Sequence, residues 1–283
     1  MRPKKATRNR VRCGLPQAVL WLAVASMALA GAACKYSAEK TLERASDAWR
    51  AGDYEQAVQL YEGYLQHAPR GDQSLETRLK LANIYYLNLH KYEPALEQYN
   101  EYLSQTSEGP ETETARERMA EVLAELGRSY QAISEYEDLI PKDDRDRRRI
   151  RLRIADLYFD EKNFSQAVTE YDKVTAETSY DDLTERALLR EASIYQLERG
   201  QFQQAIPLYQ KIVAQTSDPK VRTTSLFAIS NCEVGLYQYD QAVQTLREVK
   251  DESEQGYITR RIGEIDEMKR EQQRGEVLRP SSH

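Results

Sequence analysis

The chain has 283 residues, of which 40% are hydrophobic and 30% charged, with a formal net charge of −6. This balance is typical of a helix-rich soluble body and excludes a collagen-like or low-complexity chain. The first 34 residues hold six basic side chains and no acidic one, so the rest of the chain is more acidic than the total. An acidic body disfavours a nucleic-acid partner, because phosphate contacts need a basic face.

The N-terminus has the three-part order of a secretory signal. A basic segment over residues 1–14 precedes an apolar run that ends at Ala33, and a polar sequence follows. The uninterrupted apolar core covers residues 18–33, which is shorter than the roughly 20 residues that a membrane-spanning helix needs. We therefore expect residues 1–33 to be a signal peptide. The alternative is an uncleaved signal that anchors the chain in the inner membrane.

Small residues at 31–33 come directly before Cys34. This order resembles the lipobox of bacterial lipoproteins, in which the cysteine carries the lipid and becomes the first residue of the mature chain. The resemblance implies a palmitate-type lipid anchor on Cys34 and a tether over 34–37. Because Lys35 rather than an aspartate follows, it also implies the periplasmic face of the outer membrane. The sequence departs from the family at Gly31, where leucine is usual, and an ordinary signal peptidase site also fits these residues.

Six later segments align on one alanine, and the alanines are 35 to 38 residues apart. In five copies a tyrosine follows four residues later, so that both side chains share one face of a helix. A second small residue lies upstream in each copy, on its own amphipathic segment. Each copy therefore predicts two antiparallel helices packed around an alanine. The six expected packing residues are Ala57, Ala95, Ala132, Ala167, Ala205 and Ala242.

The turn between the two expected helices is marked by Gly52, Gly127 and Gly200, or by Asn163. The second and fifth copies have one extra residue in the first helix or its turn. After the sixth copy, residues 251–272 place their apolar side chains on one face of a helix, which is what the exposed end of a repeat array needs as a cap. Residues 273–283 lack periodicity, and we expect them to be disordered.

The pattern resembles the tetratricopeptide repeat, a helical hairpin of 34 residues that stacks into a right-handed superhelix. The resemblance covers residues 38–250 and implies an all-α solenoid of about six hairpins. In that family the first helices line a groove that binds peptides or partner helices. In this chain the groove would be apolar and aromatic at both ends and acidic in the middle. The groove residues that it implies are Trp49, Leu79, Asn83, Tyr86, Glu121, Asp156, Phe159, Phe227 and Asn231.

A charged run over residues 142–153 has two interpretations. Its aspartates are placed to offset the dipole of a helix N-terminus and to pair with the nearby arginines. Alternatively, its arginines form a basic patch that binds an acidic partner or lipid headgroups. The five arginines are Arg147, Arg148, Arg149, Arg151 and Arg153.

No catalytic, phosphate-binding or metal-ligand motif is present, so we expect neither an enzyme nor a cofactor, metal or small-molecule substrate. Cys232 lies among apolar residues and is expected to be buried. A lipid-anchored scaffold that binds protein partners is the function implied. Such chains resemble the tetratricopeptide lipoprotein of the outer-membrane β-barrel assembly machine and the pilotin-like lipoproteins of secretin and pilus assembly. The alternative is a periplasmic chaperone or quality-control protein held by an uncleaved signal in the inner membrane.

Overall fold

A computed structural model describes residues 37–106, 109–140, 143–176 and 180–275. The expected signal peptide, Cys34 and most of the C-terminal tail lie outside these residues. The described part consists of helices joined by short turns, without strands, and it divides into two units, residues 1–108 and 109–283. The all-α fold class predicted from the repeats is therefore confirmed.

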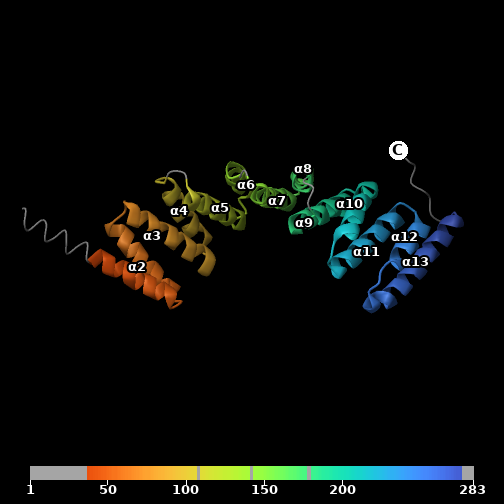
Figure 1. Cartoon of the computed structure of the whole chain (residues 1–283), viewed down its shortest axis with the longest axis horizontal. Helices are drawn as coiled ribbons and strands as arrows, with labels where there is room; N and C mark the ends of the chain where they lie inside the picture. Colours follow the sequence, from red (N-terminus) through yellow and green to blue (C-terminus); the bar gives the residue numbers. More distant parts are fainter. Residues whose placement is uncertain (1–36, 107–108, 141–142, 177–179, 276–283) are drawn as a thin grey trace, which may run out of the picture. The chain divides into compact units, whose positions relative to one another are not determined.

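The first unit contains a helix over residues 37–50, followed by three more α-helices and one π-helical turn (Figure 1). Its bounds are α2 (Tyr54–His67), α3 (Asp72–Asn83), η1 (Ile84–Asn88) and α4 (Tyr92–Leu103).

The second unit contains four hairpins and a final helix, α13, at the position predicted for the cap (Figure 1). Its bounds are α5 (Pro110–Glu125), α6 (Ser129–Asp138), α7 (Asp144–Asp160), α8 (Phe164–Thr175), α9 (Asp182–Ser193), η2 (Ile194–Glu198), α10 (Phe202–Gln215), α11 (Pro219–Gly235), α12 (Tyr239–Arg247), η3 (Glu252–Glu254) and α13 (Gln255–Gln273). Some of the helices begin at polar caps: Asp181 accepts a hydrogen bond from the backbone N–H of Thr184, and Asp218 accepts one from that of Lys220.

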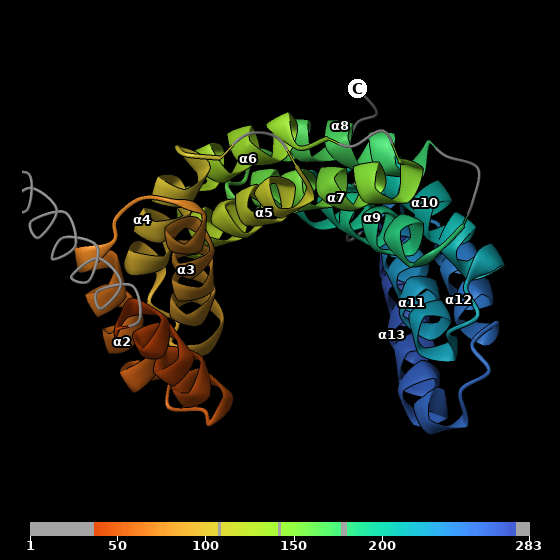
Figure 2. The same cartoon turned by 60° about the vertical axis from the view of Figure 1, so that its left-hand side comes forward.

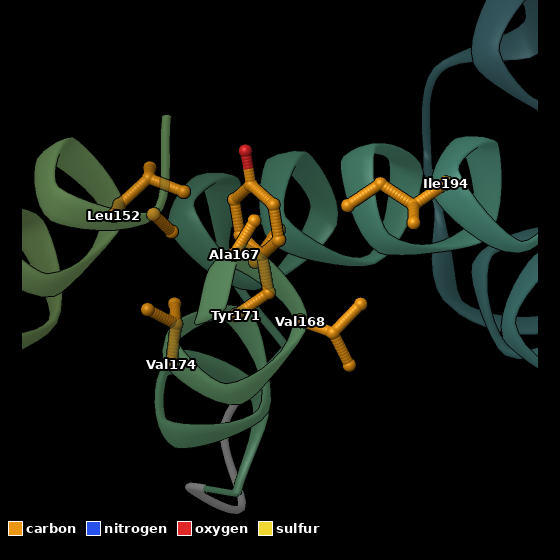
Figure 3. Close-up of a cluster of buried hydrophobic side chains, with 8 residues drawn as sticks. Leu152, Ala167, Val168, Tyr171, Val174 and Ile194 are labelled. Atoms are coloured by element: carbon orange, nitrogen blue, oxygen red, sulfur yellow. The ribbon is translucent and has the colours of Figure 1, made fainter. Parts of the chain in front are cut away.

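The six aligned alanines are all fully buried, with an exposed fraction of 0%. The tyrosine four residues later packs beside each of the first five, and four of these tyrosines reach the first helix of their own hairpin. Tyr171, for example, donates to Asp156 at 2.8 Å, and Tyr99 donates to Asn83 at 2.6 Å. Figure 3 shows Tyr171 beside Ala167 in a cluster of buried side chains from α7, α8, α9 and η2. Close packing explains why the position is alanine, since a larger side chain would separate the helices.

The extra residue of the second and fifth hairpins is accommodated in a π-helical turn. These turns are η1 and η2, each at the end of the first helix of its hairpin. A π-turn holds one residue more than the α-helical turn it replaces, so the alanine stays in register although the spacing grows. The prediction of one added residue at these two places is confirmed, and the structure assigns it to the helix end.

The turn between the helices of each hairpin has one residue in the left-handed region. Gly52, Gly127 and Gly200 occupy it as predicted, with φ of 81°, 69° and 62°. In the fourth hairpin it is Lys162, at 58°, and Asn163 instead caps α8 by accepting from the N–H of Gln166. Asn163 lies in the turn as predicted, and the left-handed residue is its neighbour Lys162. The remaining two such positions are occupied by His90 and Tyr237.

Replacing Lys162 with glycine is expected to stabilise the protein by about 0.5–1 kcal/mol. The left-handed conformation is unfavourable for a residue with a Cβ atom, and the exposed Lys162 side chain buries little surface that could offset this cost. The measurement is the free energy of unfolding in urea. The neighbouring Glu161→Gly is the control, because Glu161 has φ of −76° and glycine there should destabilise. Equal effects of both variants would contradict the prediction.

Candidate partner-binding surface

In the first unit, two of the expected groove residues are aromatic and occupy equivalent positions. Trp49 and Tyr86 each lie four residues after the small residue of their first helix. The Trp49 side chain is 49% exposed, and Tyr86 is half-buried with its ring 6.3 Å from that of Tyr92. Leu79 on α3 is also half-buried. Asn83 accepts the hydroxyl of Tyr99, so its carboxamide oxygen serves the hairpin's own packing.

In the second unit, Asp156 and Phe159 lie on α7 beside two arginines of α9. The Asp156 carboxylate accepts from Tyr171 and forms an ion pair with Arg186, while Arg190 Nε lies 3.9 Å from its Oδ1. The Arg190 guanidinium also lies over the Phe159 ring, 5.0 Å from its centroid. Asp156 is thus the centre of a cluster that joins two hairpins, and its side chain is only 16% exposed.

The first helix of the preceding hairpin, α5, is joined to α7 in a similar way. Arg149 forms a two-point ion pair with Glu117, with Nη2 at 3.2 Å from Oε2. Glu121 is half-buried near the hydroxyl of Tyr136, and both glutamates oppose ionisation of that phenol. Burial is the main reason why the pKa of Tyr136 is raised well above its ordinary value. Glu117 and Asp156, two acidic residues of the expected groove, therefore pair with arginines.

Phe227 and Asn231, on α11, contact the final helix. The ring of Phe227 packs edge-on against Tyr257 at 5.2 Å, and Asn231 accepts from Arg261 at 3.3 Å. Since α13 follows α12 where the first helix of another hairpin would lie, it covers part of the surface that these residues would otherwise offer. Sequence reasoning treated α13 only as a cap for the apolar end.

Most arginines of the 142–153 run form ion pairs with acids around them. Arg148 is 4% exposed and binds both carboxylate oxygens of Asp181, at 3.0 and 2.7 Å. Arg147 pairs with Asp144, Arg149 with Glu117, and Arg151 with Glu170. Arg153 is exposed and has no carboxylate within ion-pair distance among the described residues. The pairing that the first interpretation expected is present.

The family of tetratricopeptide repeats matches the sequence over residues 42–110 and again over 186–215. Over these two ranges the sequence matches tetratricopeptide repeats. The first match covers hairpins of the first unit and the second covers a hairpin of the second unit, in agreement with the positions of the aligned alanines. No curated protein matches the sequence.

Solved structures with the same repeats are similar in fold. The C-terminal part of a tetratricopeptide-repeat protein from Cytophaga hutchinsonii is 16% identical, with 74% of this chain and 77% of that chain covered and a TM-score of 0.57. A tetratricopeptide repeat protein from Parabacteroides merdae is also 16% identical, covering 81% and 99%, with a TM-score of 0.45. MamA from Desulfovibrio magneticus is 15% identical, covering 62% and 93%, with a TM-score of 0.47. At these identities the likeness concerns the fold.

Three further features bear on the chemistry of the chain. Cys232 is buried as expected, and burial raises the pKa of its thiol to about 11. In the part of the chain that the structure describes, no three acids, histidines or cysteines are placed to hold a metal ion. None of the described helices combines the length and the apolar character that crossing a bilayer requires.

Glu191, on α9, is a buried carboxyl group that sequence reasoning did not single out. It is 4% exposed, and its Oε2 has no hydrogen-bond partner. Asp172 of α8 faces it and raises its pKa, Lys211 of α10 acts in the opposite direction, and Tyr195 of η2 lies nearby. Burial, followed by the charge of Asp172, raises the pKa of Glu191 to about 8. The folded protein therefore holds this carboxyl group protonated at neutral pH.

The free energy of unfolding is expected to fall as pH rises from 4.5 towards 8, by at most about 1.4 kcal/mol per pH unit from this group. In that interval the folded state keeps a proton that the unfolded state releases. Urea titrations across this range should show a weaker pH dependence for Glu191→Gln. Glu198→Gln, an exposed change in the same hairpin, is the control. An unchanged slope in Glu191→Gln would contradict the assignment.

Proposed function

We propose that this chain is a lipid-anchored, non-catalytic adaptor that binds protein partners in the bacterial cell envelope. The observation that supports it best is the combination of tetratricopeptide repeats, a fold suited to protein–protein interaction, with Cys34 directly after an apolar segment and three small residues. The outer-membrane periplasmic face is the proposed location, and assembly of outer-membrane proteins, secretins or pili is the proposed context.

The anchor is tested by growing cells with labelled palmitate and isolating the protein. We expect label on the wild type and none on Cys34→Ala, because the thiol is the attachment atom in lipoproteins. Cys232→Ala is the matched control, since Cys232 is buried and should leave the label unchanged. Label that survives Cys34→Ala, or its absence from the wild type, would defeat the lipid anchor. The second candidate is an uncleaved inner-membrane signal, for which the apolar run over residues 18–33 is the observation, and it predicts an unlabelled membrane protein with its N-terminus intact.

Partner binding is tested separately with a photo-crosslinking amino acid in place of Leu79 on α3, beside the aromatic residues of the first unit. We expect a crosslinked partner that is lost in Trp49→Ala with Tyr86→Ala, because exposed aromatic side chains contribute most to such contacts. Circular dichroism must show that the double variant is folded. A crosslink that persists in this variant would show that Trp49 and Tyr86 do not contribute to partner binding.

A further inference from the structure

The structure places four arginines on one surface of the second unit. Arg149 and Arg153 belong to α7, and Arg186 and Arg190 belong to α9, which packs against α7 within the unit (Figure 2). We call these four residues, together with Phe159, the arginine surface. Arg186 and Arg190 both approach Asp156, and Arg149 and Arg153 both act on the hydroxyl of Tyr136. Arg149, Arg153 and Asp156 are three or four residues apart on α7 and so share one face of that helix, which places the two pairs of arginines side by side.

The arginines of this surface are more exposed than the two acids, Glu117 and Asp156, that join neighbouring hairpins. The side chains of Arg149, Arg186 and Arg190 are 40%, 49% and 46% exposed, against 27% for Glu117 and 16% for Asp156. Arg153 is also exposed. Four acids face the group: Asp146, Glu117, Glu121 and Asp156. Asp146 and Glu117 both pair with Arg149, whereas Arg186 and Arg190 share Asp156, which also accepts the hydroxyl of Tyr171. A ligand that approaches this surface therefore meets the guanidinium groups of Arg153, Arg186 and Arg190 first.

Arginine recurs at the same repeat position in three successive first helices. Arg118, Arg153 and Arg190 each lie two residues before the small residue of their first helix, on α5, α7 and α9. Packed helices are separated by about 8–10 Å, and an extended chain advances about 3.3 Å per residue. Every third residue of an extended peptide crossing these helices would therefore meet the next arginine.

The ring of Phe159 lies beneath the Arg190 guanidinium, which gives the surface an apolar part. The ring holds the guanidinium in a fixed orientation with its N–H groups available for a carboxylate, and arginine binds carboxylates through two parallel hydrogen bonds. Fixing a donor before binding reduces the entropy lost on association. Phe159 itself is half-buried and offers contact to a side chain between two acidic ones.

We propose that the arginine surface binds an extended, acidic segment of a partner polypeptide, with carboxylates at about every third residue. This inference rests on the proposed function as an adaptor and specifies the chemistry of one partner. It differs from a patch formed by the whole 142–153 run, because Arg147, Arg148 and Arg151 are held in other ion pairs and the arginines of α9 take their place.

The test is fluorescence anisotropy of the purified full chain with a labelled peptide of about 12 residues, long enough to cross three such helices. The peptide carries glutamate at every third position, and a second peptide has glutamine there. Arg153→Gln with Arg190→Gln should weaken binding of the acidic peptide about tenfold, and added salt should weaken it further. Arg247→Gln with Lys250→Gln removes two exposed cations outside this surface and should have no effect.

Each other outcome decides against the proposal. Equal binding of the two peptides, or an unchanged affinity in the Arg153 and Arg190 variant, would overturn it. Binding to phosphatidylglycerol vesicles but not to the acidic peptide, lost in the same variant, would overturn it in favour of a lipid-binding surface. If the acidic peptide fails while the crosslink through the aromatic surface of the first unit persists, the adaptor function stands and this inference falls.

Discussion

Arg148→Ala is expected to lower the free energy of unfolding by about 3–5 kcal/mol, the largest effect among the charged residues. Arg148 is 4% exposed, and its guanidinium binds both oxygens of Asp181, one oxygen of Asp144 and the hydroxyl of Thr184. Hydrogen bonding by Arg148 is the main reason why the pKa of Asp181 lies well below its ordinary range. Removing the cation would leave Asp181 without its partner inside the packed structure.

The variant should also change the shape of the unfolding transition. Asp181 caps α9, so the pair links α7 of one hairpin to the start of the next hairpin, 33 residues later. Repeat arrays gain their cooperativity from contacts between neighbouring repeats. Losing this contact should separate the unfolding of the two hairpins and lower the slope of the urea transition followed by circular dichroism.

Arg145→Ala is the matched control for this prediction, because Arg145 belongs to the same helix and approaches Asp181 only at 3.9 Å, while it is 65% exposed and lies 3.3 Å from Asp182. Exposed pairs contribute little, so its effect should stay below about 1 kcal/mol. Arg148→Met with Asp181→Asn should recover part of the loss, since it removes both charges and keeps a capping side chain. Equal effects of Arg148→Ala and Arg145→Ala would contradict the buried role.

Tyr171→Ala is expected to destabilise by about 3–5 kcal/mol, because the side chain is fully buried and its loss leaves a cavity. The ring fills the space beside Ala167, between Leu152 and Ile194 (Figure 3). Tyr171→Phe keeps this packing and removes only the hydrogen bond to Asp156, at a cost of about 1 kcal/mol. Urea unfolding measures both changes. A phenylalanine variant as unstable as the alanine variant would show that the hydrogen bond, and not the ring, dominates.

The hairpins could be predicted from sequence because their determinants are local and periodic. Ala167 and Tyr171 are four residues apart on one helix, and the same pair recurs in five hairpins. The added residue of the second and fifth hairpins was visible as a change in spacing, but its conformation depends on how the helix end packs, so the π-turns appear only in three dimensions. Asn163 marked the fourth turn correctly, but Lys162 lacks the signal of a glycine, so the sequence carried no sign that it would take the left-handed conformation.

The candidate surface was predictable only in part. Register identified Asp156 and Phe159 as groove residues, but it carried no sign that Asp156 would be neutralised from α9. Arg186 and Arg190 lie 30 and 34 residues from Asp156, and charged residues on helices are frequent, so nothing in the sequence selects these two. Aligning the residues two before each small position would have drawn attention to Arg118, Arg153 and Arg190.

The sequence by itself determined the helical hairpins, their number and their buried alanine faces, since apolar periodicity needs no knowledge of distant neighbours. It also supplied the reasons to propose a signal peptide and a lipid on Cys34. Tertiary structure alone decided which charges are used internally: Arg148 became a buried link to Asp181, whereas Arg153, in the same run, stayed exposed. Ion pairs between hairpins depend on the packing of helices about 30 residues apart, and the favourable partner of an arginine is fixed only when that packing forms.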